Sequence, residues 1–216
     1  MKFYKIIFFT VLVSCTFSSY AQKVLSDGIL VYNISVETGS AKPKMADAFD
    51  GATITVYLKD NISRTEMVSG LGSEATIHNA ATGSSVILKE YSDQKLMTTL
   101  SADNWEEINK KFDGITFENT SETVVISGYN CHKAIAKLKN GSTFTVYYTT
   151  EVKLANKNYD YQFKNLPGLP VQYEQQSDKL NIKLTLSKIS FDNIPSSKFE
   201  IPKSGFRIQT YDETKK

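Results

Sequence analysis

Apolar residues alternate with polar ones over long parts of the chain, and this period of two constrains the fold more than any other feature. In the first clear example, Leu30, Tyr32, Ile34 and Val36 share one parity. Alternation of this kind, rich in β-branched and aromatic residues, is typical of strands that are buried on one face. The pattern predicts strands at 30–37, 53–59, 62–68, 75–80, 86–91, 96–100, 123–127, 131–138, 144–152, 171–175 and 180–191.

Short turn signals join these strands and predict one antiparallel sheet. Asn140-Gly141 favours a two-residue type I′ hairpin turn. The apolar positions change parity between Leu186 and Ile189, which predicts a β-bulge near Ser187 or Lys188. We therefore expect a mainly β protein, a single antiparallel open (incomplete) barrel of roughly ten or eleven strands, in one domain over residues 22–216.

Two short amphipathic segments interrupt the strands. Asp103 and Glu106 have the spacing of a capping box, and Trp105, Ile108 and Phe112 then share one helical face. A second helix is predicted over residues 43–51, from Pro43 to Gly51. Each helix either plugs the open side of the sheet and completes the core, or forms a lid over a cavity for an apolar ligand, and the two roles can coexist.

The first 21 residues have the order of sections that a secretory signal peptide has. Lys2 and Lys5 precede an apolar run that is too short to span a membrane, and small residues follow it. We expect cleavage after Ala21 and a mature chain without a transmembrane span. The alternative is a lipoprotein anchored through Cys15, because Leu12-Val13-Ser14-Cys15 resembles a bacterial lipobox.

The charge of the chain argues against a nucleic-acid partner, and its cysteine content argues against an intramolecular disulfide. The chain has 25 basic and 23 acidic residues, and both surplus lysines lie in the signal segment. No nucleic-acid partner is expected, because such proteins need a basic surface to neutralise phosphates. Cleavage after Ala21 leaves Cys131 as the sole cysteine, so the fold must be held by its core without an intramolecular disulfide.

Residues that commonly carry catalysis or bind metals are sparse. His78 and His132 are far apart, and neither has a second His, Cys or carboxylate at a known metal-ligand spacing. Cys131 and His132 are strand neighbours that point to opposite faces, so they cannot easily act as a thiol and base pair. We expect no catalytic residue, no metal, no cofactor and no enzyme activity.

Residues in the C-terminal half resemble a family of exported bacterial proteins. The run from Asn165 to Pro170 matches four of the six positions of the Gly-Leu-Pro-Gly-Leu-Ile motif of the GLPGLI family. The wider context is similar to a related group of bacterial domains of unknown function, through residues 128–134, 147–149 and 199–202. Both groups are similar to the LolA/LolB lipoprotein-carrier superfamily, whose fold is an incomplete barrel around a hydrophobic cavity, closed by helices.

This resemblance implies a periplasmic or envelope location and the binding of acyl chains. It implies a LolA-like domain over residues 22–216 and supplies no catalytic residue. Pro167 and Gly168 stiffen a loop that would display two leucines, either as a simple turn at the rim or as a hydrophobic lip at a cavity mouth. The candidate ligand-binding residues are Trp105, Ile108, Phe112, Leu166 and Leu169.

Three functions are weighed from the sequence, and an enzyme is the least favoured of them. The leading hypothesis is an exported, non-catalytic carrier or binder of an apolar ligand, with a lipid or acyl chain as its partner. The alternative is a cell-envelope interaction module whose core is fully packed, which binds another protein and no ligand.

Overall fold

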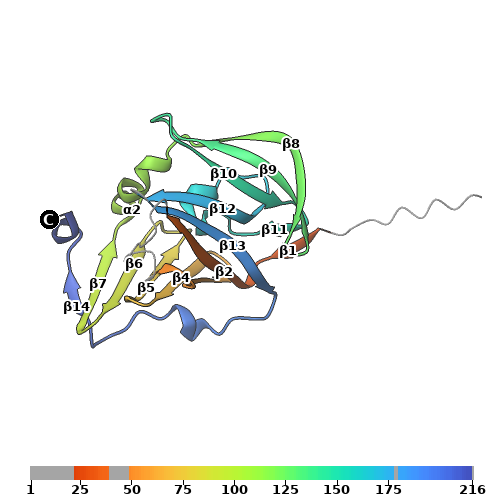
Figure 1. Ribbon diagram of the computed structural model, residues 1–216. Helices are drawn as coiled ribbons and strands as arrows, with labels where there is room; N and C mark the ends of the chain where they lie inside the picture. Colours follow the sequence, from red (N-terminus) through yellow and green to blue (C-terminus); the bar gives the residue numbers. More distant parts are fainter. Residues whose placement is uncertain (1–21, 39–48, 178–179, 216) are drawn as a thin grey trace, which may run out of the picture.

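The computed structural model describes residues 22–38, 49–177 and 180–215, and the fold is mainly β (Figure 1). The strands are β1 (Lys23–Leu25), β2 (Asp27–Thr38), β3 (Thr53–Lys59), β4 (Ile62–Ser69), β5 (Gly72–Asn79), β6 (Ser85–Tyr91), β7 (Gln94–Leu100), β8 (Thr116–Ile126), β9 (Tyr129–Lys137), β10 (Thr143–Thr149), β11 (Val152–Leu154), β12 (Leu169–Ser177), β13 (Leu180–Ser190) and β14 (Arg207–Gln209). The helical elements are α2 (Ala102–Asn109) and the 3-10 turns η1 (Lys110–Phe112), η2 (Lys157–Tyr159), η3 (Tyr161–Phe163), η4 (Ser196–Phe199) and η5 (Asp212–Lys215).

Twelve of these strands form one curved sheet in the order β14-β7-β6-β5-β4-β3-β2-β13-β12-β10-β9-β8. All of its neighbours are antiparallel except β14 and β7, and β1 pairs separately with β11 in parallel. The expected mainly β, open sheet is confirmed, whereas its description as an incomplete barrel is not confirmed. The expected strand number was too low because β1, β11 and β14, at three residues each, are too short to show alternation.

The expected bulge is present, whereas one expected turn type is wrong. The register of β13 against β2 shifts between Leu186 and Lys188. The β9–β10 hairpin turns at Asn140-Gly141, but only Gly141 has a positive φ, of 86°. The Asn140 side chain accepts a hydrogen bond from the Ser142 amide at 3.0 Å, and the Gly141 amide donates to the Leu138 carbonyl. The loop is therefore a three-residue turn with a left-handed glycine, not a type I′ turn.

One α helix, α2, is described, and it begins earlier than expected. Ser101 caps it: the Ser101 hydroxyl accepts from the Asn104 amide at 3.2 Å, and the Asn104 side chain accepts from the Ser101 amide. The expected capping box of Asp103 and Glu106 is wrong, because Asp103 already lies in the first turn. The other expected helix falls on residues 43–51, of which 43–48 lie outside the described residues.

No helix among the described residues combines the length and the apolar character that crossing a membrane requires.

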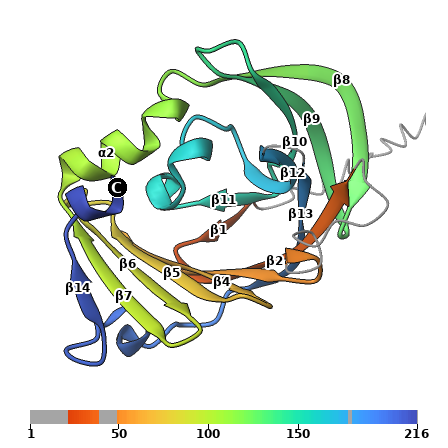
Figure 2. The same cartoon turned by 60° about the vertical axis from the view of Figure 1, so that its left-hand side comes forward.

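The main hydrophobic core fills the inner face of one half of the sheet, formed by β2, β3, β9, β10, β12 and β13. Residues 155–168, which we call the inner segment, run from β11 to β12 inside the curve (Figure 2). Their central residue is Phe163, whose ring meets the ring of Tyr173 edge-on at 4.7 Å and that of Phe144 at 6.4 Å. The protein's own side chains therefore occupy much of this half of the interior.

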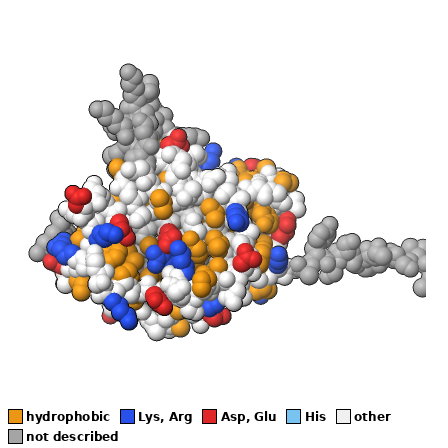
Figure 3. Space-filling view, turned by 90° about the horizontal axis from the view of Figure 1, so that it is seen from below, with side chains coloured by type: hydrophobic (Ala, Val, Ile, Leu, Met, Phe, Trp, Pro, Cys, Tyr) orange, Lys and Arg blue, Asp and Glu red, His pale blue; other side chains and the backbone are white. Residues whose placement is uncertain are grey.

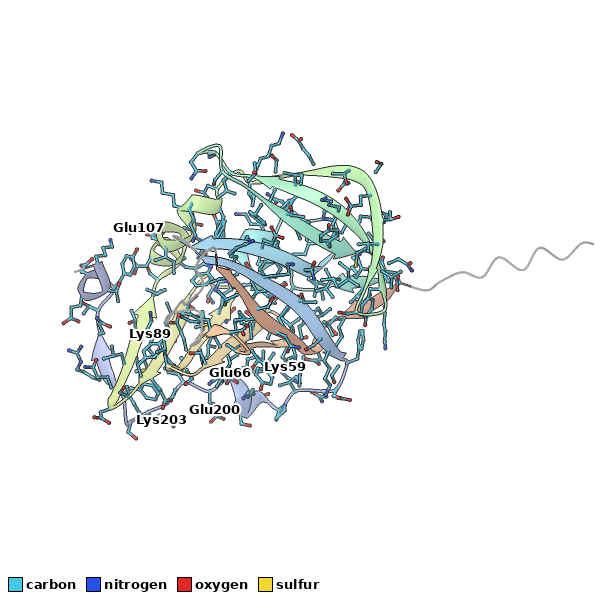
Figure 4. All side chains as sticks on the ribbon, viewed as in Figure 1. Lys59, Glu66, Lys89, Glu107, Glu200 and Lys203 are labelled. Carbon is cyan, nitrogen blue, oxygen red and sulfur yellow. The ribbon has the colours of Figure 1, made fainter. Side chains whose placement is uncertain are left out.

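Residues 191–215, which we call the C-terminal strap, cross the outside of the sheet and end beside α2 (Figures 1 and 2). Lys198 of the strap forms an ion pair with Glu66 of β4 at 3.1 Å. Figure 4 shows Glu66 on the side of the sheet where Glu200 of the strap lies. Seen from below, the molecule shows apolar side chains interspersed with basic and acidic ones (Figure 3). This face therefore carries charges of both signs and no large patch of one sign.

The last part of the C-terminal strap contacts both the outer face of the sheet and helix α2. Phe206 packs on a small apolar cluster that consists of Ala75, Ile77, Val86 and Leu88. At the end of the strap, Lys215 forms an ion pair with Glu107 of α2 at 2.9 Å. The strap therefore covers the outer face of β5 and β6 and then contacts α2.

Candidate functional site: a polar pocket beneath helix α2

The inner face of strands β4 to β7 carries buried polar side chains. Ser63 lies opposite His78, and His78 lies opposite Ser85, in one row across three strands. Ser63, His78, Ser85 and nearby Thr98 are each at most 5% exposed. His78 Nδ1 lies 2.8 Å from the Ser85 hydroxyl, so part of this polar row satisfies itself by hydrogen bonding.

Helix α2 lies over this polar row as a cover. The indole of Trp105 stacks on the imidazole of His78, with ring centroids 4.6 Å apart and planes 19° apart. Burial lowers the pKa of His78, which favours the neutral imidazole. No residue of α2 is fully buried, so the helix contributes a lid-like contact and little to the core.

The inner segment brings a carboxylate to the same place. Asp160 Oδ1 accepts a hydrogen bond from the Gln162 amide at 2.9 Å. The residue as a whole is half-buried, but its carboxyl group lies deep enough that burial raises the pKa of Asp160 to about 6. The neighbouring Tyr161 hydroxyl donates to Asp113 at 2.6 Å, which fixes the tyrosine ring. Burial and the hydrogen bond from the Gln162 amide determine the shift of the Asp160 pKa, and among the described residues no cation contributes to it.

Together these groups enclose a pocket of about 160 Å³, which we call the polar pocket. Strands β4 and β5, helix α2 and the inner segment each contribute to its wall. Its lining residues are Ser63, Thr65, Thr76, His78, Trp105, Asn109, Tyr159, Asp160 and Tyr161. Hydroxyl groups and aromatic rings dominate, and Asp160 is the one lining residue with a formal charge while His78 is neutral.

A larger recess of about 650 Å³, the hairpin recess, lies beside η1 and the β9–β10 turn. Its apolar lining is Phe112, Leu138, Phe144 and Ile182, and its polar lining is Lys111, Asn140, Ser142, Thr143, Gln162, Glu174 and Gln175. A third recess, of about 220 Å³, borders the loop at Leu166, Pro167 and Gly168.

The structure does not bring the five expected ligand-binding residues together. Trp105 lines the polar pocket, Phe112 the hairpin recess and Leu166 the third recess. Ile108 is 38% exposed and lines none of the three. Leu169 is fully buried in the main core. The residues therefore belong to separate surroundings, and their role in ligand binding stays a prediction.

The expectation that the proline-glycine loop displays its leucines at the surface is wrong. Leu166 is 1% and Leu169 is 0% exposed. The loop turns inward because Gly168 packs directly on β10, where a Cβ atom would lie 2.1 Å from the Thr149 carbonyl oxygen. The loop therefore anchors the inner segment to the sheet.

Sequence reasoning weighed His78 only as a metal ligand and did not single out Asp160. The sequence offered one signal, because Asn and Asp favour Asx turns and both Asn156 and Asp160 stand in the non-periodic run of the inner segment. In the structure each accepts a hydrogen bond from the amide two residues later.

Cys131 is buried and His132 is exposed on the opposite face, as predicted, and burial raises the pKa of Cys131 to about 11. Among the described residues, no cluster of three His, Cys, Asp or Glu side chains is placed to hold a metal ion.

Comparison with protein families matches residues 38–204 to the family described as domain of unknown function (DUF4412). The chain belongs to this family. The resemblance to bacterial domains of unknown function is thus confirmed at that level, whereas the GLPGLI and LolA-like labels are not confirmed. No curated protein matches the chain.

Several solved structures are similar to this member of the DUF4412 family at low sequence identity. An uncharacterized conserved protein from Thermus thermophilus has a TM-score of 0.49 and 9% identity, over 86% of this chain and 91% of its own. MucB has a TM-score of 0.41 and 7% identity, over 85% and 60%. The Mycobacterium tuberculosis lipoprotein LppX has a TM-score of 0.37 and 12% identity, over 76% and 86%.

Proposed function

We propose that this protein is a non-catalytic binding protein that takes up the apolar part of a ligand, such as an acyl chain, in the hairpin recess. The observation that carries the proposal is the lining of this recess, in which four apolar side chains face about 650 Å³ of space. Ligand sites in proteins are concave and of comparable volume. In the hairpin recess the four apolar residues lie among seven polar ones. Each buried methylene would contribute about 0.8 kcal/mol.

The rim of the hairpin recess suits an amphipathic ligand. Phe112 ends η1, and the Lys111 ammonium lies 4.8 Å from the centre of its ring. Lys111 and Glu174 add one charge of each sign to the lining. An apolar chain would contact Phe112 and Phe144, while a polar head group would stay at the charged rim.

The proposal includes export of the protein. The signal sequence, its cleavage after Ala21 and the alternative lipid anchor at Cys15 all fall on residues 1–21, outside the described residues. The intact mass of the native protein tests this part. A chain that begins at Gln22 supports cleavage by an ordinary signal peptidase, an acylated chain that begins at Cys15 supports the lipoprotein, and an uncleaved chain contradicts export.

Lipid extraction after mild purification tests the ligand. We expect native mass spectrometry to detect an apolar molecule on the full mature chain, and Phe112→Asp to lower its occupancy at least tenfold. Val125→Asp is the matched control, because Val125 is an apolar residue, 66% exposed on β8, outside the hairpin recess. A wild-type protein that carries no lipid and takes up no added fatty acid would overturn the proposal.

One observation favours the alternative of an envelope interaction module. Strand β8 forms one edge of the sheet, and it exposes Val124 (40%) and Val125 (66%). An edge strand with exposed apolar side chains is able to pair with another chain. Loss of a co-purifying protein in Val125→Asp, with no change in Phe112→Asp, would favour this second function.

A further inference from the structure

The polar pocket contains a negative charge without an opposite charge in its lining, and this points to a second binding site. Asp160 is its one charged lining residue, and no cation among the described residues contributes to the pKa of its carboxyl group. Buried carboxylates in proteins are normally paired with a cation or a metal ion. The pocket therefore lacks one positive charge.

Aromatic rings line the same pocket as this carboxylate. Trp105 and Tyr161 approach from α2 and η3, and Tyr159 approaches from η2. The faces of such rings attract cations through the ring quadrupole. The Tyr161 ring already attracts one cation, because the ammonium of Lys164, a residue outside the lining, lies 3.5 Å from its centre.

We propose that the polar pocket binds a small organic cation, a primary or quaternary ammonium group, between Asp160 and the rings of Trp105, Tyr159 and Tyr161. The carboxylate supplies the opposite charge and the rings desolvate the substituents on nitrogen. The hydroxyl groups of Ser63, Thr65 and Thr76 accept or donate hydrogen bonds to a ligand hydroxyl.

The volume sets an upper limit on the ligand. A cavity of about 150 Å³ in another protein takes up a molecule the size of benzene. The polar pocket, at about 160 Å³, therefore admits an ammonium compound of similar size and not a peptide or an acyl chain. This site is distinct from the hairpin recess, because the two linings share no residue.

The protonation states support a cation at neutral pH. Burial raises the pKa of Asp160 to about 6, so its carboxylate is charged at pH 7.5, and burial lowers the pKa of His78, so its imidazole is neutral. The other charged groups close to the lining are Asp113, at the Tyr161 hydroxyl, and Lys164, over the Tyr161 ring. Cation binding should weaken as the pH falls below about 6, because Asp160 loses its charge.

Titration of the full mature chain with choline and with ethylammonium, followed by calorimetry and by the indole signal of Trp105 in NMR, tests the proposal. The probe 3,3-dimethylbutan-1-ol is the neutral isostere of choline. We expect both cations to bind at pH 7.5 and the neutral alcohol to bind at least tenfold more weakly. Equal binding of the alcohol would show an apolar pocket and would overturn the proposal.

Two variants locate the charge. Asp160→Asn keeps the acceptor for the Gln162 amide and should lower the affinity for choline at least tenfold. Asp103→Asn is the matched control, since Asp103 is an exposed residue of α2 outside the lining, and it should bind as the wild type does. Unchanged choline affinity in a folded Asp160→Asn variant contradicts the site, as does competition by Ca²⁺ or Na⁺ at concentrations that show a metal-ion site.

A third comparison identifies the source of the ammonium group. Glycerophosphocholine tests a lipid head group against free choline. Tighter binding of the glycerophospho compound supports a head group as the source, and tighter binding of choline supports a free amine. Phe112 lies outside the polar pocket, so Phe112→Asp should leave the affinity for choline unchanged. The proposal for this site and the proposal for the hairpin recess are therefore tested independently.

Discussion

The two halves of the sheet use their faces in opposite ways. In the half that contains β2, β12 and β13, apolar side chains point inward, and the inner segment packs on them. In the half formed by β4 to β7, the buried apolar cluster lies on the opposite face from His78, under Phe206 of the C-terminal strap. The strap therefore supplies an outer core, which leaves the inner face of that half free to carry Ser63, His78 and Thr98.

This difference teaches that alternation alone does not show which face of a strand is the inside. A strand with one apolar face needs a covering element on that face, and alternation does not tell whether the face lies inside or outside the curved sheet. The location of the polar pocket depends on a segment, residues 191–215, that is remote in sequence from the strands it covers.

The largest expected losses of stability are both in the apolar half, at Leu169 and at Phe163 of the inner segment. Leu169 is completely buried, so Leu169→Ala should lower the free energy of unfolding by about 2–5 kcal/mol, through lost transfer energy and a cavity. Urea unfolding measures it. Ser63→Ala, at a similarly buried position on the polar inner face, should cost less than about 1 kcal/mol. A similar loss for both variants would contradict the contrast between the two halves.

The next effect has the opposite sign and depends on pH. The folded-state pKa of Asp160 is about 6 against an ordinary 3.8, so its charged form disfavours folding, and the penalty develops as the pH rises through this range. Asp160→Asn should therefore stabilise the protein by up to about 3 kcal/mol at pH 7.5 and by almost nothing at pH 3.5. Thermal unfolding at the two pH values checks this. An equal gain at both would exclude the buried charge as its cause.

A smaller loss is expected from the cover of the polar half. Trp105→Ala removes a ring that stacks on His78 but belongs to a helix without fully buried residues, so it should cost about 1 kcal/mol. Phe163→Ala, in the inner segment, should cost about 3–5 kcal/mol. Equal costs for the two aromatic residues in chemical denaturation would show that α2 is an integral part of the core.

The smallest effect concerns the thiol on β9. Cys131 is 0% exposed and burial raises its pKa to about 11, so the thiolate required for alkylation is scarce in the folded protein. We expect iodoacetamide to label Cys131 only after denaturation, as measured by mass spectrometry. Rapid labelling of the native protein would show that the apolar half opens more readily than its packing indicates.

Most strands were predictable because their alternation is strong and local, and so was the bulge between Leu186 and Lys188. Strand β8 was predicted only from residue 123 although it begins at Thr116, because residues 118–122 are exposed and polar on both faces. Turn types were less predictable than strands. The Asn140 side chain accepts a hydrogen bond from the Ser142 amide, and this bond belongs to a three-residue turn and not to the expected type I′ turn.

The candidate site was less predictable than the sheet. Trp105 could be singled out as a large apolar residue on a short helix, but its partner His78 lies on another strand, in a register that only the folded sheet defines. Asp160 sits in a run of polar and aromatic residues without periodicity, where an acidic residue is ordinarily solvated. The enclosure of its carboxylate follows from the path of the inner segment, and that path depends on long-range contacts such as those of Gly168.

The C-terminal strap also has a consequence for the order of folding during synthesis. Ala75, Ile77, Val86 and Leu88 are made before Phe206, which packs on them and lies more than a hundred residues later in the chain. A growing chain would hold this apolar strip uncovered until the C-terminal strap has been made, and such strips promote aggregation. The apolar strip of β5 and β6 is therefore a segment that a chaperone would be expected to bind until the C-terminal strap has been made.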